Sequence, residues 1–186
     1  MGRIKPPRPA KLICGLIGGD ADLLVRARGL LAKQIRQIEA VSDLWPFDQT
    51  DYYKQEMGED LKRQFVSFAG LVQVDRLAEI KRLTNQIEQR IAEEVLDPEI
   101  PRPVNLDPGY ITLSKLVLAS TKDYSHRIYL QAGIYAEVTL HYESGGWRAW
   151  PWTYPDYAAP TYHAFFTQVR EALKGQLAQG GDADNG

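Results

Sequence analysis

The sequence predicts a single α+β domain with a largely antiparallel sheet. A chain of 186 residues suits one compact domain that buries roughly 70% of its unfolded surface. Two amphipathic helical segments each follow an apolar segment with strand character, and a clear hairpin comes later in the chain. The order β-α-β-β-α-β, followed by a hairpin extension and a last helix, predicts a ferredoxin-like core. Right-handed crossovers would place the two core helices on one face of the sheet and leave the other face for the extension and the last helix.

The two ends of the chain carry little apolar sequence. Met1 to Ala10 is basic and proline-rich, and Gln179 to Gly186 is rich in Gly, Asp and Asn. Segments of this composition bury too little apolar surface to become ordered. We therefore expect a disordered N-terminal arm over 1–10, one folded domain over 11–178 and a disordered tail over 179–186.

The first strand-helix unit begins at Lys11. The run KLICGLI that starts there predicts a buried strand, and Asp20 is a candidate N-cap for the next helix. Apolar residues at helical spacing predict that this helix spans Ala21 to Ile38. A glycine turn before a helix can also bind phosphate through backbone N–H groups. A plain turn is the favoured interpretation, because the sequence lacks a P-loop pattern and Asp20 would repel an anion.

The middle of the chain predicts two strands and a second long helix. Leu44 to Phe47 is a short extended segment whose proline favours an edge position, and Gln64 to Ala69 has the aromatic and β-branched residues typical of a strand. Thr50 to Lys62, between them, fits one or two helical turns or an ordered loop. The spacing of apolar residues predicts an amphipathic helix over Asp75 to Leu96.

This second helix carries a stripe of polar residues. Spacings of three and four place Lys81, Thr84 and Glu88 on one stripe, with Asn85 beside it. A solvated helix face is the favoured explanation. A binding surface is the alternative, because Asn85 and Glu88 are polar groups that packing does not require.

The segment from Arg102 to Ser120 contains a strong turn signal. Arg102 to Leu106 predicts a short strand, and Asp107-Pro108-Gly109-Tyr110 predicts a turn with proline second and glycine third. Asp107 fits two roles equally well: it could open the turn through a backbone hydrogen bond, or it could be a functional carboxylate. Ile111 to Ser120 fits a short helix as well as a strand.

The clearest hairpin closes at Gln131-Ala132-Gly133. Glycine at the last position of a three-residue loop supplies the positive φ that such loops favour. The loop sets a register with one apolar face and one polar face. The apolar pairs are Ile128 with Ala136 and Leu130 with Ile134, and the pairs on the other face are Tyr129 with Tyr135 and Arg127 with Glu137.

Aromatic residues and prolines follow the hairpin. A turn at Gly145-Gly146 leads to a third strand. Thr161 is the predicted N-cap of a last helix over Tyr162 to Leu177. The third strand is aromatic and contains Trp147, Trp150 and Trp152.

Composition limits the possible partners and location. The 22 basic and 24 acidic residues give a net charge of -2, so no overall field attracts nucleic acid. The single cysteine, Cys14, cannot form an intramolecular disulfide and fits a reducing compartment. The apolar run from Leu12 to Ile17 is far shorter than the roughly 20 residues of a membrane span. We therefore expect a cytoplasmic protein with no membrane partner.

Five ordered motifs resemble those of the bacterial family called domain of unknown function 4416. The resemblance extends from Lys11 to Leu173, and it implies no particular activity because the function of that family is not known. The motifs are YYKQEMG at 52–58, LTNQIE at 83–88, NLDPGY at 105–110, KDYSHRIYL at 122–130 and WTYPDY at 152–157.

The chain also contains polar residues that packing does not require. Lys122 and Arg127 are candidates to hold an anionic substrate. Asp107 and Glu137 are candidates to bind a divalent cation such as Mg²⁺ or to move a proton, and His126 is a candidate general base. A surface ion pair between Arg127 and Glu137 and a structural His126 are the alternatives. The remaining candidate ligand-binding residues are Asn85, Glu88, Asn105, Lys115, Asp123 and Thr139.

Two functions fit these residues. The favoured one is an enzyme or sensor that binds a phosphorylated small molecule or nucleotide at a site where these polar groups converge, and the sequence leaves open whether it is an enzyme. The alternative is a non-catalytic module that binds RNA or a protein through an aromatic sheet face. The negative net charge and the lack of an RNP-type sequence count against RNA. The aromatic candidates are Tyr129, Tyr135, Trp150 and Trp152.

Overall fold

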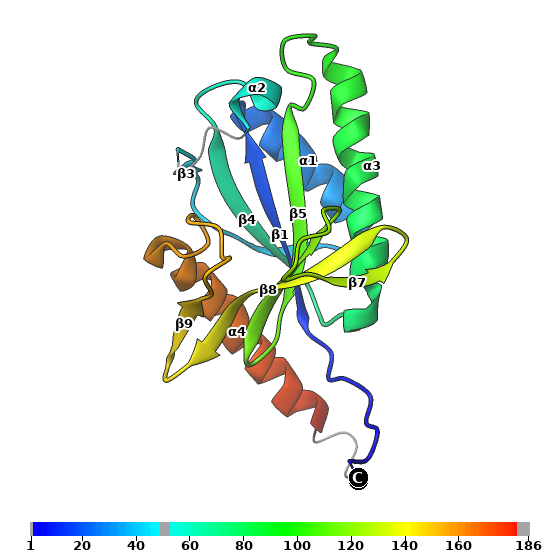
Figure 1. The fold of residues 1–186 in the computed structure, drawn as a ribbon, viewed down its shortest axis with the longest axis vertical. Coiled ribbons are helices and arrows are strands. Elements are labelled where there is room, and N and C mark those ends of the chain that lie inside the picture. Colours follow the sequence, from blue (N-terminus) through cyan, green and yellow to red (C-terminus); the bar gives the residue numbers. More distant parts are fainter. Residues whose placement is uncertain (1, 49–52, 182–186) are drawn as a thin grey trace.

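The computed structural model describes residues 2–48 and 53–181. Within these residues one sheet of nine strands runs through the molecule, and helices cover both of its faces (Figure 1). The elements in chain order are β1 (Lys11–Gly18), α1 (Ala21–Gln34), β2 (Ile38–Val41), β3 (Trp45–Pro46), α2 (Lys54–Met57), β4 (Lys62–Phe68), η1 (Val74–Arg76), α3 (Leu77–Val95), β5 (Val104–Ile111), β6 (Lys115–Ser120), β7 (Ile128–Gln131), β8 (Ile134–Glu143), β9 (Gly146–Ala149) and α4 (Pro160–Gly181).

Neighbouring strands in this sheet are antiparallel in each pairing between described strands. The strand order is β2-β4-β1-β5-β6-β8-β7, with β3 beside β4 and β9 beside β8. The predicted fold class, a single α+β domain with a largely antiparallel sheet, is therefore confirmed. The ferredoxin-like character of its core stays a prediction.

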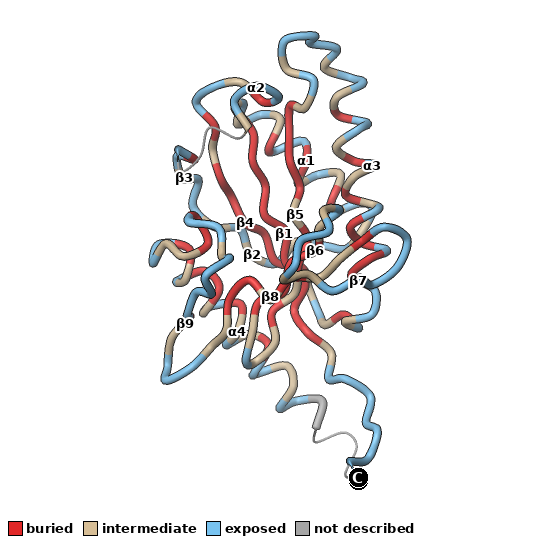
Figure 2. The backbone as a smooth tube through the Cα atoms, in the orientation of Figure 1, coloured by how far each residue is buried: buried red, intermediate tan, exposed pale blue. Residues whose placement is uncertain are grey.

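β1 lies in the middle of the sheet, between β4 and β5. All eight of its residues are buried, as its unbroken apolar run predicts. Leu12, Cys14 and Leu16 pack against α1 and α3 in one core. Ile13 points to the opposite face, where it joins an aromatic core with Phe166 of α4. Figure 2 shows this continuous burial along the central strands.

Both long helices on the first face are present, but their bounds differ from the prediction: α1 begins at Ala21 as predicted and ends early, and α3 begins at Leu77, two residues after the predicted Asp75. The Asp20 side chain accepts a hydrogen bond from the Asp22 N–H at 2.8 Å, which confirms the N-cap. α1 ends at Gln34, so the prediction that it reaches Ile38 is wrong. Ile38 instead begins β2 and pairs with Phe68 of β4. α3 ends at Val95, and Leu96 takes a left-handed backbone conformation with φ 50°.

The predicted turn at Asp107-Pro108-Gly109-Tyr110 is wrong, because β5 runs straight through it. The four residues pair in register with β1, and Gly15 lies opposite Asp107. Proline fits here because β5 pairs with β6 only from Gly109 onward. Glycine fits because a Cβ at Gly109 would lie 2.4 Å from the Val117 carbonyl oxygen of β6. Close strand packing therefore explains this glycine.

The undecided segment Ile111 to Ser120 is not a helix: Ile111 ends β5, residues 112–114 form a bend between the strands, and Lys115–Ser120 form β6. The ladder between β5 and β6 is short, since it contains three residue pairs, Gly109 to Ile111 with Leu118 to Leu116. Before Gly109 the two strands separate. β5 thus has one free edge over its first half, and the sheet forks at this point.

The hairpin register is correct in part. Ile128 pairs with Ala136 and Tyr129 with Tyr135, as predicted. Gln131 pairs with Ile134, in place of the predicted Leu130, because Ala132 and Gly133 both adopt positive φ and a bulge shifts the register.

The last part of the chain differs from the predicted boundaries. β9 contains Trp147, while Trp150 and Trp152 lie after the strand. α4 begins at Pro160, so Thr161 lies inside the helix and does not cap it. α4 also includes Gln179 to Gly181, which were expected in the tail. Residues 182–186 lie outside the described residues.

Candidate functional site

A cavity of about 410 Å³ opens at the fork between β5 and β6. Gly15 of β1 lies beneath it, and a Cβ there would come within 3.0 Å of Arg63 Nη1 and of the Tyr157 hydroxyl. Glycine thus leaves room for these large side chains. The cavity is lined by Phe47, Tyr53, Arg63, Lys81, Arg102, Asn105, Asp107, Leu118, Ala119, Ser120, Thr121, Lys122, Tyr124, Arg127, Glu137, Tyr154, Pro155, Asp156 and Tyr157.

Three cationic side chains from separate elements surround Asp107. Arg63 of β4 lies 3.7 Å from Asp107 Oδ2, and Lys81 of α3 lies 3.6 Å from Oδ1. Asn105 donates a hydrogen bond to Asp107 Oδ2 at 2.6 Å. Arg102, just before β5, donates to the Asn105 side-chain oxygen. We call Arg63, Lys81 and Arg102 the basic cluster.

Lys81 and Glu88 satisfy the free edge of β5. Lys81 Nζ donates to the Leu106 carbonyl oxygen at 2.7 Å, and Glu88 Oε1 accepts from the Leu106 N–H at 2.7 Å. A buried backbone group without a partner would be destabilising, so these side chains take the role of a neighbouring strand. The predicted solvated stripe is therefore wrong for Lys81 and Thr84, which are 5% and 0% exposed.

The charges around Asp107 favour its ionised form. Burial raises the pKa of the Asp107 carboxyl, but Lys81, Arg63, the hydrogen bond from Asn105 and Arg102 together outweigh burial and leave the pKa below its ordinary value. The opposite balance holds at Glu88, where burial raises the pKa even though Lys81 and Arg102 lie nearby. Asp107 is therefore the carboxylate that this cluster holds ionised.

A second group of polar side chains centres on Glu137 of β8. Glu137 Oε2 accepts from Arg127 Nε at 2.8 Å and lies 3.1 Å from His126 Nε2. Thr139 donates to Glu137 Oε1 at 3.2 Å. The side chains of Arg127 and Glu137 are 3% and 2% exposed. Because the pair is buried, the alternative of a surface ion pair is wrong.

Arg127 is fully engaged within this second group. Its Nη1 donates to the Ser120 hydroxyl at 2.6 Å and to the Lys122 carbonyl oxygen at 3.2 Å. Its Nη2 donates to the Tyr154 hydroxyl at 3.1 Å. The guanidinium carbon also lies 4.5 Å from the centre of the Tyr124 ring.

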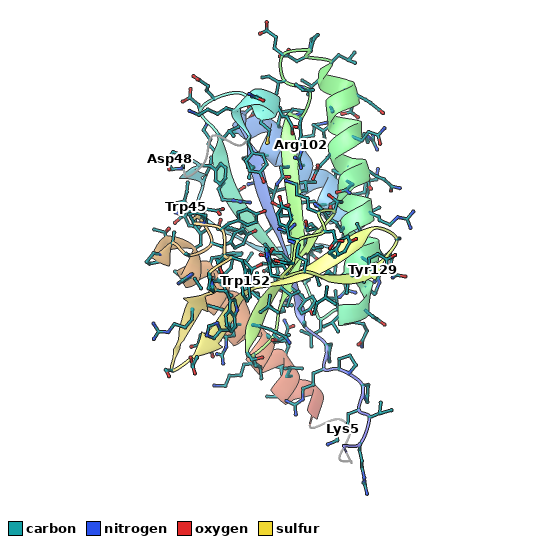
Figure 3. All side chains as sticks on the ribbon, in the orientation of Figure 1. Lys5, Trp45, Asp48, Arg102, Tyr129 and Trp152 are labelled. Atoms are coloured by element: carbon teal, nitrogen blue, oxygen red, sulfur yellow. The ribbon has the colours of Figure 1, made fainter. Side chains whose placement is uncertain are left out.

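Aromatic residues lie next to the cavity in a stacked row. Trp150 and Trp152 are parallel, with ring centres 5.3 Å apart. The His126 ring is stacked with Trp152 at 5.4 Å between ring centres, and the ring of His141 lies 4.4 Å from that of Trp150. Tyr129 lies apart from this row of rings, on the β7–β8 hairpin and away from Trp152 (Figure 3). The four predicted aromatic residues therefore form two separate groups.

The structure brings together many of the predicted site residues and leaves some apart. Those that line the cavity are Asn105, Asp107, Lys122, Arg127 and Glu137. Those that contact a lining residue are Glu88, His126 and Thr139. Those outside the cavity lining are Asn85, Asp123, which is exposed, and Lys115, which lines a separate cleft with Tyr110 and the N-terminal arm.

Several lining residues were not among the sequence candidates. Arg63 and Lys81 were missed because a residue inside a strand and a residue on a helix stripe have simple structural explanations. Tyr154, Asp156 and Tyr157 lie in the WTYPDY motif, which was the available signal. Other missed polar residues of the lining are Tyr53, Arg102, Ser120, Thr121 and Tyr124.

Within residues 2–48 and 53–181, no group of three or more His, Cys, Asp or Glu side chains is arranged to hold a metal ion. Asp107 faces Lys81 and Arg63, and Glu137 faces Arg127. Both predicted metal ligands therefore have cationic partners in this structure.

Comparison with known proteins identifies the family. The model of the family described as Domain of unknown function (DUF4416) matches residues 8–173, so the chain belongs to that family. No curated protein and no solved structure matches the chain. None of the helices among the described residues is long and apolar enough to span a membrane.

Proposed function

We propose that this protein binds a small phosphorylated molecule or nucleotide in the cavity at the fork of the sheet. The observation that carries the proposal is the charge of the walls. Five cationic side chains and three carboxylates are found among the described residues that line the cavity. Arginine and lysine are the residues that hold phosphate and carboxylate groups in proteins. An excess of cations around one cavity therefore favours an anionic ligand.

The size and the apolar walls of the cavity support a ligand larger than a bare ion. Its volume of about 410 Å³ lies in the range of small-molecule sites. Tyr53, Tyr124 and Tyr154 supply planar surfaces and hydroxyl groups beside the cations. A molecule with a charged group and a planar or apolar part fits this lining.

The cavity also contains groups that could take part in a reaction. Asp107 is held ionised by its neighbours, so it could accept a hydrogen bond from a bound molecule and orient it. Glu137 lies beside His126, which is partly exposed and could exchange a proton with solvent. These contacts support a catalytic role as an extension of the binding proposal. The expected location is the cytoplasm, since the single Cys14 fits a reducing compartment.

A ligand screen by thermal unfolding tests the binding proposal. The panel contains nucleoside mono-, di- and triphosphates, sugar phosphates and inorganic phosphate, each with and without Mg²⁺. A ligand that binds only the folded protein raises the unfolding midpoint by mass action. We expect at least one phosphorylated compound to do so, while its dephosphorylated counterpart does not.

A matched pair of variants locates the binding. Arg102→Gln removes a cation from the cavity wall, and Arg90→Gln removes an exposed one that pairs with Glu94 on the outer surface of α3. The midpoint shift should fall in Arg102→Gln and persist in Arg90→Gln. Equal shifts in the two variants, or no shift with any compound, would contradict the proposal.

RNA or a protein partner bound through aromatic residues is the alternative function. A nucleobase stacks on an open ring face. Trp152 stacks with both Trp150 and His126, and Trp150 also packs against His141. These contacts occupy part of the ring faces of Trp150 and Trp152, which favours the small-molecule proposal.

A further inference from the structure

Asp107 makes looser ion pairs than the other carboxylates that line the cavity. Its oxygens lie 3.6 Å from Lys81 Nζ and 3.7 Å from Arg63 Nη1. The pair of Arg63 with Asp156 measures 2.6 Å, and the pair of Arg127 with Glu137 measures 2.8 Å. Charge-assisted N–H···O bonds are typically about 2.7–2.9 Å long. Asp107 is therefore attracted to both cations without a direct hydrogen bond to either.

Unused hydrogen-bond donors are concentrated around the same carboxylate. Arg63 is 3% exposed, yet its Nε and Nη1 atoms have no hydrogen-bond partner among the described residues. Lys81 Nζ donates to the Leu106 carbonyl, and it lies 3.6 Å from Asp107 and 4.0 Å from Glu88. Buried donors without partners are rare and costly. Arg63 therefore has capacity for another acceptor, while Arg102 already donates to Glu88 and Asn105.

The other cationic end of the cavity has much less spare capacity. Arg127 uses its Nε, Nη1 and Nη2 atoms in hydrogen bonds to Glu137, Ser120, the Lys122 carbonyl and Tyr154. An added anion there would have to replace existing bonds. The end of the cavity at Arg63 and Lys81 is therefore the better place for a charged group of the ligand than the end at Arg127.

We propose that Lys81 and Arg102 form a subsite for a phosphate group, and that Asp107 is an internal counter-ion which the phosphate replaces. When phosphate approaches, the Asp107 carboxylate moves toward the unpaired Nη1 of Arg63 and closes the gap of 3.7 Å. Lys81, Arg102 and the Asn105 amide then face the phosphate oxygens. This inference rests on the proposed function and specifies which end of the cavity holds the charged group.

The exposure of the groups fits this exchange. The side chain of Asp107 is 24% exposed and that of Arg102 is 32% exposed, whereas Arg63 is buried behind them. The carboxylate and Arg102 are thus accessible from the cavity, while the guanidinium that would receive Asp107 lies deeper. A tetrahedral oxyanion could come from free phosphate or from a phosphate ester, and the two share this chemistry.

Asp107→Asn tests the counter-ion, because it removes the negative charge and keeps the shape of the side chain. Inorganic phosphate and pyrophosphate are the probes, and calorimetry measures their affinity for the full-length protein. We expect Asp107→Asn to bind each probe at least about tenfold more tightly than the natural protein, because a like charge has left the subsite. Glu79→Gln, which removes an exposed carboxylate that pairs with Arg76, should leave the affinity unchanged.

A double variant assigns the gain to the subsite. Asp107→Asn combined with Arg102→Gln should lose most of the tenfold increase, since the phosphate would lack one of its two cations. An Asp107→Asn protein that binds the probes no more tightly than the natural one would overturn the inference. The inference would also be overturned if Asp107→Asn failed to bind the probes in the presence of Mg²⁺ but bound them in its absence, because Asp107 would then be a metal ligand.

The subsite and the proposed function can fail separately. If nucleotides or sugar phosphates bind the natural protein and Asp107→Asn with equal affinity, the counter-ion is wrong and the cavity remains a ligand site. If no phosphorylated compound binds either protein, both proposals are wrong. Should Asp107→Asn not fold, Arg102→Gln against Arg90→Gln still tests the phosphate subsite, because only the former should weaken pyrophosphate binding; equal binding would overturn it.

Discussion

Replacing Glu137 with Gln should destabilise the fold strongly. Glu137 is 2% exposed, and its carboxylate interacts with Arg127, His126 and Thr139 at 2.8, 3.1 and 3.2 Å. Glutamine keeps the shape, and its oxygen can still accept from Arg127, but it carries no negative charge. The buried guanidinium would lose its counter-ion.

The size of the effect follows from burial. Breaking a buried ion pair by removing one partner costs about 3–5 kcal/mol, because the remaining charge is left without compensation. An exposed pair contributes less than about 1 kcal/mol. Arg127 is 3% exposed, so the buried case applies. We expect Glu137→Gln to reduce the free energy of unfolding by about 3–5 kcal/mol.

Urea unfolding at neutral pH measures this free energy by linear extrapolation. Glu79→Gln is the matched control, since its pair with Arg76 is exposed on α3. If Glu137→Gln loses no more stability than Glu79→Gln, the pair with Arg127 does not stabilise the fold as argued. A folded Glu137→Gln protein that has lost only ligand binding would instead indicate a purely functional carboxylate.

Two further predictions concern β5. Gly109→Ala places a Cβ 2.4 Å from the Val117 backbone oxygen. This variant should lower the unfolding midpoint, at a cost of about 1–3 kcal/mol in the free energy of unfolding. In the control Gly29→Ala the Cβ meets no atom within 4 Å, so the midpoint should not fall. The pKa of Asp107 lies below its ordinary 3.8, so the stability that ionisation contributes is present above that pH and is lost as pH falls through the folded pKa. The gap in unfolding free energy between the natural protein and Asp107→Asn should therefore shrink on acidification below about pH 3.8.

Each of these predictions has a clear contrary result. Equal midpoints for Gly109→Ala and Gly29→Ala would mean that β5 and β6 can separate at little cost. A stability gap for Asp107→Asn that stays constant or widens in acid, measured by urea unfolding across that range, would mean that the cations do not favour the ionised carboxylate.

The elements that were predicted well are those whose pattern is determined by burial alone. The apolar run of β1 follows from burial of both faces of the strand, and the helical spacing of α3 follows from burial of one face of the helix. Neither pattern depends on a particular distant partner. Ile38 was misassigned because an apolar residue at helical spacing also suits an edge strand. Its pairing with Phe68 decides between the two.

The turn at Asp107 could not be rejected from local sequence. Asp-Pro-Gly has the residues that a turn prefers, and the same residues suit a strand that has one free edge and a close neighbour. That choice depends on where β6 begins to pair and on the distance from Gly109 to Val117, both of which are tertiary facts. Local propensity was therefore overridden by packing.

The candidate site was predicted in part for the same reason. Asp107, Arg127 and Glu137 were found because polar residues in strand segments are difficult to explain by packing. Lys81 was misassigned to a solvated face because its partner is the free carbonyl of Leu106, which exists only if β5 lacks a neighbour there. Arg63 gave no signal, since a cation in a strand often points to solvent.

The short ladder between β5 and β6 has a consequence for how the domain holds together. The strands on either side of it form two parts of the sheet, joined at that ladder by three residue pairs. Arg63 and Asp107 belong to one part, and Glu137 belongs to the other. A molecule that touches both walls would add contacts across this joint. Occupancy of the cavity would then fix the angle between the two parts, and the protein would hold one shape more firmly when loaded than when empty.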